Sequence, residues 1–353
     1  MTLAEVIEKI TPPDEFIRRE CLRRWDQVAK PLHSLGLLET LTAQIAGIQR
    51  TDLPHIKKRR VLVFCADNGV VSEGVTQSDS SVTAAVAESI AGGCSNVNLM
   101  AASAGAEVEV WDVGMDRDVT HPLLHRCKGA YGTRNLAVEP AMTREEAVFA
   151  LETGIHAVEQ AGKDGCDLLL AGEMGIGNTT TAAAIICCLL DQKPEDIVGR
   201  GSGLSNEGLR RKIRAIERGL AQNKPNPEDP LDVLSKMGGF DIAAMCGAYL
   251  ACGALHIPVI LDGAISGAAA LLAARFAPDS VGTFLPSHVS GEPCGKLVLE
   301  ALHLKAPICA GLALGEGTGA VALLPLLDMA LAVYYGGHSF DSIGVEAYEE
   351  QSE

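Results

Sequence analysis

The sequence is poor in aromatic residues and in positive charge, and both shortages limit what the protein can do. Phe, Trp and Tyr make up 4% of the 353 residues, and 29 Lys and Arg stand against 45 Asp and Glu, for a net charge of −16. Nucleic acids and anionic membranes are bound through a basic face. We therefore expect neither as a partner. A single phosphate group remains a possible ligand, because backbone N–H groups at a helix N-terminus can hold one in an acidic protein.

The eleven cysteines lack the spacing of a metal or redox site. No two form a CxxC pair, so we interpret them as reduced thiols and expect no metal. The first residues, MTLAEVIEKITPPDEF, carry charges where a secretory signal would be apolar. The apolar stretches 247–275 and 306–335 are interrupted by Asp262 and Glu316. These features predict a cytoplasmic protein without a membrane span.

Apolar runs alternate with helical segments along most of the chain. The runs cover residues 61–70, 107–115, 167–175 and 257–266, and most of them end in an acidic residue and a glycine. Strands that are apolar throughout are buried on both faces, as in parallel sheets covered by helices. The sequence therefore predicts an α/β fold, with ligands bound at the carboxyl ends of the strands. Residues 1–50 have helical spacing.

The stretch GEMGIGNTTTAAAI (172–185) follows an apolar run and has the order strand, glycine-rich turn, helix start. This order suits a phosphate cradle made of backbone N–H groups. Its spacing approaches that of a P-loop, but Asn178 stands where the P-loop lysine would be. A nucleoside triphosphatase is thus a rival interpretation that lacks its key residue, and Asn178 and Thr179 could also be simple helix caps.

Two carboxylates lie in glycine-rich, apolar surroundings and are candidate acids or bases. Glu316 occurs in LALGEGTGAVALL and Glu173 in GEMGIGN. Burial raises the pKa of a carboxyl group, which suits proton transfer. Glu173 could instead be a charge at a helix start. His288 could be a catalytic base or a packed side chain, and Lys212 could bind phosphate or be a solvated surface charge.

Several motifs together resemble the nicotinate-nucleotide:dimethylbenzimidazole phosphoribosyltransferases, which make the lower-ligand nucleotide of cobamides. The motifs are GEMGIGNTT (172–180), GRGSGL (199–204), GGFDIAAMCGAYL (238–250), PVILDGAIS (258–266), SHVSGEP (287–293) and LGEGTGA (314–320). KPLHSLG (30–36), ADNGVVSEGV (66–75), GTRNLA (132–137) and PAMTREEA (140–147) also fit. The resemblance covers nearly the whole chain in the family's order.

The resemblance implies a doubly wound, Rossmann-like α/β fold with a mainly parallel sheet and a small helical domain. We expect residues 1–55 to form the N-terminal part of the small domain and residues 56–335 the large domain with the active site. Residues 336–353 would return to the small domain or form a polar tail. A dimer is implied, either of identical chains or with a homologous subunit.

The implied reaction moves phosphoribose from nicotinate mononucleotide to an aromatic base, with inversion to the α-glycoside and release of nicotinate, without metal, ATP or another cofactor. By matching, Glu316 would be the general base, and Glu173 would support the ribosyl cation. The predicted phosphate and ribose ligands are Gly175, Gly177, Asn178, Thr179, Lys212, Ser290 and Gly315. The predicted base pocket consists of Asn68, Ser80, Ala85, Val86, Ala264 and Leu314.

The departures from the family gather in the base pocket. Asn68 replaces the usual histidine, Ala85 and Val86 a Gln-Met pair, Ala264 an aromatic residue, and Cys294 and Gly295 a Gly-His pair. We therefore favour an altered acceptor, namely another benzimidazole, a purine or a phenol, over neutral drift around dimethylbenzimidazole. The alternatives are one subunit of a heteromeric phenol or base phosphoribosyltransferase and a non-catalytic nucleotide-binding homologue.

Overall fold

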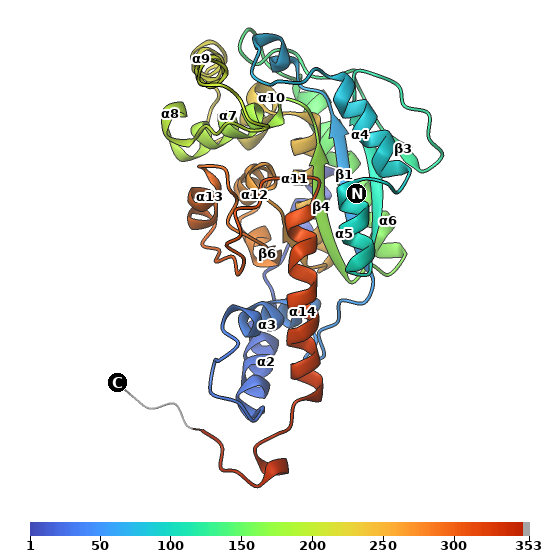
Figure 1. The fold of residues 1–353 in the computed structure, drawn as a ribbon, viewed down its shortest axis with the longest axis vertical. Coiled ribbons are helices and arrows are strands. Elements are labelled where there is room, and N and C mark those ends of the chain that lie inside the picture. Colours follow the sequence, from blue (N-terminus) through green and yellow to red (C-terminus); the bar gives the residue numbers. More distant parts are fainter. Residues whose placement is uncertain (349–353) are drawn as a thin grey trace.

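A six-stranded sheet, parallel throughout, organises the computed structural model, which describes residues 1–348 (Figure 1). The strands lie in the order β3-β2-β1-β4-β5-β6. Their bounds are β1 Arg59–Ala66, β2 Ala106–Gly114, β3 Leu124–Arg126, β4 Leu168–Met174, β5 Val259–Leu261 and β6 Phe284–Pro286. This is the doubly wound order, and the predicted fold class is confirmed. The strand order reverses between β1 and β4.

The apolar side chains of β1 show that the sheet is buried on both faces. Leu62 and Phe64 pack into the core on one side, and Val61 and Val63 pack into a second core on the other. Alternate residues of a strand point to opposite faces, so a strand covered by helices on both sides must be apolar throughout. The four predicted strands are present. The three-residue strands β3 and β6 are not predicted, whereas the equally short β5 is, because β5 lies within the longer apolar run 257–261.

Helices cover both faces of the sheet. The first core contains residues of α1, α6, α7, α9, α10, α11 and α12, and the second contains residues of α3, α4, α5 and α14. The bounds are α1 Leu3–Lys9, α2 Glu15–Gln27, α3 Leu37–Gln49, α4 Ser81–Ala91, α5 Asn96–Ser103, α6 Arg144–Lys163, α7 Asn178–Leu190, α8 Pro194–Ile197, α9 Asn206–Asn223, α10 Pro230–Met237, α11 Phe240–Leu255, α12 Ala264–Phe276, α13 Gly295–Ala301 and α14 Thr318–Gly336. Short 3₁₀ turns are η1 Gly69–Glu73, η2 Pro278–Thr283 and η3 Asp341–Ile343.

Helices α6 and α11 cross at two glycines. A Cβ atom on Gly154 would lie 1.8 Å from the carbonyl oxygen of Ala244, and one on Gly247 would lie 1.9 Å from that of Leu151. No side chain fits at either position, so the two backbones are in direct contact. The abundance of small residues in the sequence is explained by such close helix packing.

A separate small core joins α2 and α3 to the far end of α14, at the lower end of Figure 1. Trp25 and Tyr334 pack together there with their ring centroids 5.3 Å apart. Residue His338 returns to this unit, since its carbonyl oxygen accepts a hydrogen bond of 2.8 Å from the Ala29 N–H. Helix α1 differs from the expectation for residues 1–55, because its apolar Val6 is buried in the large core against α6 and α11. Part of the predicted C-terminal segment, residues 349–353, lies outside the described residues.

Helix α14 is apolar enough and long enough, by length and composition alone, to cross a membrane, and no other helix within residues 1–348 meets that test. Buried core helices of soluble proteins meet it too. In this fold 44% of the apolar stretch is buried, against the sheet and the small core.

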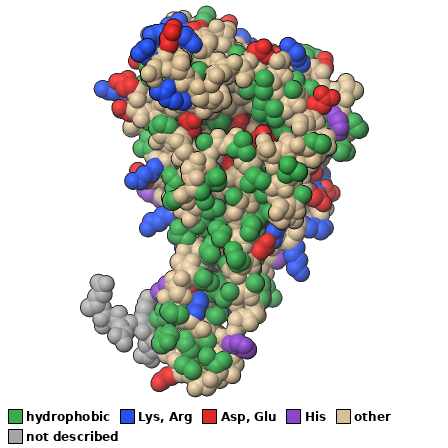
Figure 2. Space-filling view, in the orientation of Figure 1, with side chains coloured by type: hydrophobic (Ala, Val, Ile, Leu, Met, Phe, Trp, Pro, Cys, Tyr) green, Lys and Arg blue, Asp and Glu red, His purple; other side chains and the backbone are tan. Residues whose placement is uncertain are grey.

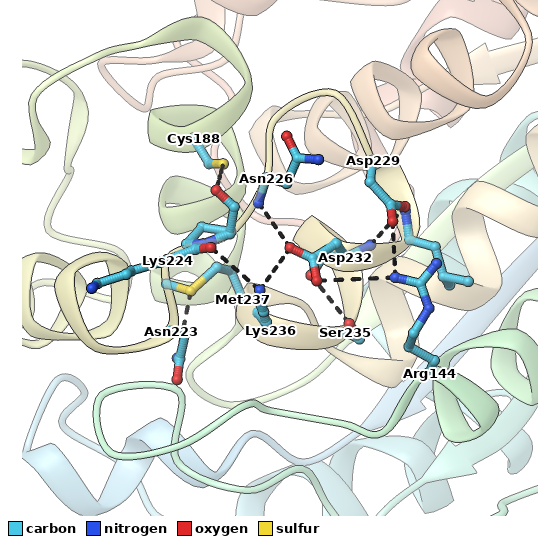
Figure 3. A network of polar contacts seen from close by, with 12 residues as sticks. Arg144, Cys188, Asn223, Lys224, Asn226, Asp229, Asp232, Ser235, Lys236 and Met237 are labelled. Atoms are coloured by element: carbon cyan, nitrogen blue, oxygen red, sulfur yellow. Dashed lines mark hydrogen bonds and ion pairs between the residues drawn. The ribbon is translucent and has the colours of Figure 1, made fainter.

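A polar network fixes the connection between α9 and α10 (Figure 3). Arg144 pairs with Asp229 at 2.9 Å, and Asp232 accepts hydrogen bonds of 2.8 Å from Lys236 Nζ and from the Asn226 N–H. The network thereby ties the end of α9, the helix that carries Lys212, to α10 and, through Arg144, to the start of α6.

Candidate active site

A cavity of about 210 Å³ opens at the carboxyl ends of the strands, beside the point where the strand order reverses. Its walls come from the loop between β4 and α7, the start of α12, the loop after β6 and the loop before α14. This is the place where α/β sheets bind ligands.

The cavity brings together most of the residues that the sequence singled out. Those that line it are Glu173, Gly175, Gly177, Asn178, Thr179, Ala264, Ser290, Leu314, Gly315 and Glu316. Arg200, Asp262, His288 and Glu292 line it as well. The residues Lys212, Asn68, Ser80, Ala85 and Val86 are not part of its wall.

Glu316 lies on an unusual stretch of backbone. Gly315, Glu316 and Gly317 all have positive φ, at 85°, 60° and 85°. Such a conformation is unfavourable for a non-glycine residue and is found where surrounding structure enforces it, often at functional sites. Gly172 in β4 permits it, since a Cβ there would lie 2.4 Å from the Glu316 carbonyl oxygen.

The environment of the Glu316 carboxylate makes it a stronger base than a free glutamate. Burial raises its pKa, and the nearby charge of Asp262 raises it further, whereas the Val97 N–H, 3.4 Å from Oε2 at the start of α5, lowers it. A raised pKa brings a carboxylate closer to the range useful for accepting a proton at neutral pH.

Asp262 ties the loop of Glu316 to the end of β5. Its carboxylate accepts hydrogen bonds from the N–H groups of Gly317 (3.2 Å) and Ala320 (3.1 Å), in the first turn of α14. A carboxylate is favoured at a helix N-terminus. The sequence showed only that an acidic residue ends this strand; the cap could not be foreseen, because Gly317 lies 55 residues further along the chain.

His288 also lines the cavity, and a hydrogen bond to Ser287 holds its ring in place. Ser287 Oγ donates to the Leu261 carbonyl oxygen at 2.6 Å, so it accepts from His288 Nδ1 at 2.9 Å. Burial lowers the pKa of the ring, and the charge of Asp262 opposes that effect. The ring is therefore a positioned donor and acceptor on the wall between Asp262 and Ser290.

The part of the cavity wall formed by the start of α7 suits an anion. Gly177, Asn178 and Thr179 at the N-terminus of α7 line it, and a helix N-terminus attracts negative charge. Lys212 lies directly behind this turn and is fully buried; its Nζ donates to Thr179 Oγ1 at 2.8 Å and to the Gly199 carbonyl oxygen at 3.2 Å. Burial lowers the pKa of Lys212 to about 8.

Asn68 has a supporting position rather than one in the cavity wall. Its Oδ1 accepts from Thr181 Oγ1 at 3.2 Å, and its Nδ2 donates to the Ile176 carbonyl oxygen at 3.4 Å. Ile176 lies in the loop between β4 and α7, and Thr181 lies in the first turn of α7. Asn68 therefore supports this loop through hydrogen bonds. Its assignment to the base pocket stays a prediction that rests on the resemblance.

Three further residues predicted for the base pocket lie on or next to α4. Ser80 precedes the helix and is partly buried, Ala85 is exposed, and Val86 packs against the second core. Since none of them lines the cavity, their assignment to the base pocket rests on the resemblance alone.

Within residues 1–348, no group of three or more His, Cys, Asp or Glu side chains is arranged to hold a metal ion. The eleven cysteines, all within the described part of the chain, are free thiols.

Comparison with known proteins agrees with this geometry. Residues 10–345 match the family described as "Phosphoribosyltransferase". The nicotinate-nucleotide–dimethylbenzimidazole phosphoribosyltransferase of Acetivibrio thermocellus is 41% identical over 350 residues, covering 99% of both chains. The protein of the same name from Escherichia coli is 40% identical over 334 residues, covering 94% of this chain and 93% of that one. A crystal structure of CobT from Thermus thermophilus, 40% identical, superposes with a TM-score of 0.89 over 94% of this chain and 99% of that one.

The match spans the sheet, the cavity and the helical unit, at an identity that shows common descent. The chain therefore belongs to the phosphoribosyltransferase family.

Proposed function

We propose that this chain transfers the phosphoribosyl group of nicotinate mononucleotide to an aromatic base, releasing nicotinate and forming an α-glycosidic nucleotide of the kind used as a cobamide lower ligand. The observation that carries the proposal is the cavity itself, which is lined by two buried carboxylates, Glu173 and Glu316, and by the N-terminal turn of α7, whose Asn178 donates a hydrogen bond to Glu173. The names of the relatives supply the donor and the class of acceptor.

The donor would lie with its 5′-phosphate on the turn of α7. The N–H groups of the helix N-terminus and the buried Lys212 supply positive charge there, and Thr179 connects the two through its hydroxyl. A single phosphate held in this way needs no P-loop lysine, which is why Asn178 is compatible with the turn. Ser290, with its Oγ facing Gly263 on the neighbouring wall, would contact the ribose.

The reaction needs a base but no acid. The bond between the anomeric carbon and the pyridinium nitrogen breaks, its electron pair stays on that nitrogen, and nicotinate leaves with a neutral ring. A ring nitrogen of the acceptor attacks the anomeric carbon from the opposite face, which inverts the configuration. The proton lost by the acceptor goes to the Glu316 carboxylate. Glu173, which lines the same cavity, would lie close to the positive charge that develops on the ribose and would stabilise it.

We propose a benzimidazole as the acceptor. Of the departures named for the base pocket, Ala264 lines the cavity, whereas Asn68 supports a loop and Ala85 is exposed on α4. The dimethylbenzimidazole named for the relatives stays the first candidate. A phenol would react through the same base by giving its hydroxyl proton to Glu316.

The test is a competition assay. Purified protein is incubated with nicotinate mononucleotide and equal amounts of dimethylbenzimidazole, adenine and p-cresol, and products are read by mass spectrometry. We expect the benzimidazole product. A phenolic or purine product would refute the proposed acceptor, and the absence of any product would refute the proposed function for this chain alone.

We also propose that the protein is a homodimer of the cytoplasm, joined through the outward face of α14. Met329 and Val333 on that face are 57% and 36% exposed, Leu326 is partly exposed beside them, and Figure 2 shows hydrophobic side chains gathered along this part of the surface. Nearby Asp328 pairs with Arg59, so the stripe carries no unpaired charge there. Free thiols throughout suit the reducing cytoplasm.

The dimer is tested by light scattering of the wild type and of Met329→Glu, with Glu88→Gln on exposed α4 as the surface control. We expect a dimer, lost in Met329→Glu and kept in the control. A monomeric wild type, or a requirement for a second, homologous chain, would contradict the proposal.

A further inference from the structure

Asp241, in the motif GGFDIAAMCGAYL, is a fully buried acid that the proposed chemistry does not use. It lies at the start of α11, beneath the loop between β4 and α7. We propose that Asp241 is a positioning residue: acting through the side-chain amide of Asn178, it fixes the place of Glu173 against the bound ribose. This inference rests on the proposed function and assigns a role in it to a residue outside the cavity.

The bridge is made by one nitrogen. Asn178 Nδ2 donates to Asp241 Oδ2 at 2.8 Å and to Glu173 Oε2 through a second, short contact. An amide nitrogen carries two hydrogens and a carboxylate is only an acceptor, so both hydrogens are used. This arrangement determines which way the amide points, because turning it over would place its oxygen against two carboxylates.

The bridge is enclosed. Glu173, Asn178 and Asp241 are 7%, 4% and 0% exposed. Asp241 Oδ1 also accepts from the Ile242 N–H at 3.0 Å, at the N-terminus of α11, where a negative charge is favoured. Water therefore does not compete for these hydrogen bonds, and the position of the three side chains is set by the protein.

Two glycines pack against the Asp241 carboxylate, at positions where any side chain would clash with it. A Cβ on Gly175 would lie 2.6 Å from Asp241 Oδ2, and a Cβ on Gly239 would lie 2.6 Å from Asp241 Oδ1. The glycine of the anion-binding loop and the glycine before α11 thus pack on the carboxylate from two sides. Asp241 cannot shift without moving the loop that holds the substrate phosphate.

No basic side chain within the described residues pairs with either acid. The ionisable groups that face the bridge are the acids Asp67, Asp262 and Glu316 and the thiol of Cys65. Burial raises the pKa of Asp241 to about 6 and that of Glu173 well above its usual range, and the charge of Asp241 adds to the effect on Glu173. The amide of Asn178 is thus the main neutral group that holds the two acids together.

Asp241 has no direct access to the substrate, since it does not line the cavity. Its hydrogen-bonded link to Glu173 passes through Asn178, and this gives a prediction about pairs of substitutions. If Asn178 is already replaced, replacing Asp241 should have little further effect on the position of the Glu173 side chain.

The experiment is a double-mutant cycle of Asp241→Ala and Asn178→Ala, with kcat and KM measured for nicotinate mononucleotide. We expect Asp241→Ala to lower kcat about tenfold to a hundredfold, with KM changed less than about threefold. The double variant should be no slower than Asn178→Ala. Asp241→Asn, which keeps an acceptor oxygen, should recover part of the loss. Cys246→Ala, buried on the same helix, controls for packing and should keep the wild-type kcat.

Losses that multiply in the double variant, or an Asp241→Ala enzyme with wild-type kcat, would overturn the inference. A second measurement does not depend on activity. In a crystal structure of Asp241→Ala, or of Asp241→Asn if the alanine variant does not fold, we expect the Asn178 amide to have turned or moved away from Glu173. An unchanged contact would refute the bridge even if wild-type protein transferred no phosphoribose, an outcome that would separately refute the proposed function.

Discussion

Replacing Lys212 by methionine should stabilise the empty protein while removing its affinity for the nucleotide. Methionine has a similar length and no charge. Lys212 is fully buried and makes no ion pair within residues 1–348; its ammonium group donates to a hydroxyl and a carbonyl oxygen, and the charge of Glu292 only partly offsets the effect of burial on its pKa. A buried charge without a counter-charge destabilises a fold unless a ligand neutralises it.

The magnitude follows from the pKa and the hydrogen bonds. Lowering the pKa of Lys212 from 10.5 to about 8 corresponds to a destabilisation of about 3 kcal/mol when the amine is charged. Methionine removes that term but loses two hydrogen bonds, each worth about 1 kcal/mol. The variant should therefore be about 1 kcal/mol more stable at pH 7.

The pH dependence has a definite sign. Because the pKa is lower in the folded than in the unfolded state, the wild type gains stability as the pH rises from about 8 to 10.5. The methionine variant lacks this gain. Its advantage at pH 7 should thus disappear and reverse by pH 10.5.

The assay is urea unfolding of both proteins at several pH values, with and without nicotinate mononucleotide. The nucleotide should raise the unfolding free energy of the wild type and leave that of Lys212→Met nearly unchanged. Lys296→Met, at a side chain 79% exposed, is the control and should change stability by less than about 0.5 kcal/mol. A variant that is less stable at pH 7, has the same pH slope and is stabilised equally by the nucleotide would refute the reasoning.

Three further predictions concern the loop of Glu316. Glu316→Gln should lower kcat at least about a hundredfold while leaving nucleotide binding by calorimetry unchanged; a small loss would exclude Glu316 as the base. Asp262→Asn removes a charge that raises the pKa of Glu316, so the acid limb of the kcat–pH profile should move to lower pH, and a shift to higher pH would contradict the assignment. Gly172→Ala should inactivate the enzyme, since the added methyl group would lie 2.4 Å from the Glu316 carbonyl oxygen, whereas Ala171→Gly in the same strand should retain activity; a fully active Gly172→Ala would show that the loop can relax.

The elements with strong local signals could be predicted from the sequence. Strands β1, β2, β4 and β5 are predicted by apolar runs, and the glycine turn at 172–177 is predicted because its spacing suits an anion-binding loop. Glu173 and Glu316 stood out as carboxylates in apolar surroundings. The parts of the fold that the sequence predicts are thus those whose cause lies within a short stretch of chain.

The features that the sequence does not predict depend on residues that lie far apart in the chain. Asp241 and Asp262 act on residues 63 and 55 positions away in the chain, and nothing in their local sequence marks those partners. The hydrogen bonds of Asn68 join it to residues 108 and 113 positions away, which its local sequence does not indicate. Helix α1 was grouped with its sequence neighbours, although its apolar face fits the large core.

The crossing of α6 and α11 has a consequence for how the enzyme responds to heat. With Gly154 and Gly247 seated against backbone carbonyl oxygens, α11 can neither rotate nor slide along α6 while the two stay packed. Asp241 begins that helix, so its depth below the cavity is fixed by a contact between main chains rather than between adaptable side chains. Gradual loosening of the site on warming is therefore blocked, and we expect activity to persist until the large core melts and then to disappear with it in a single step.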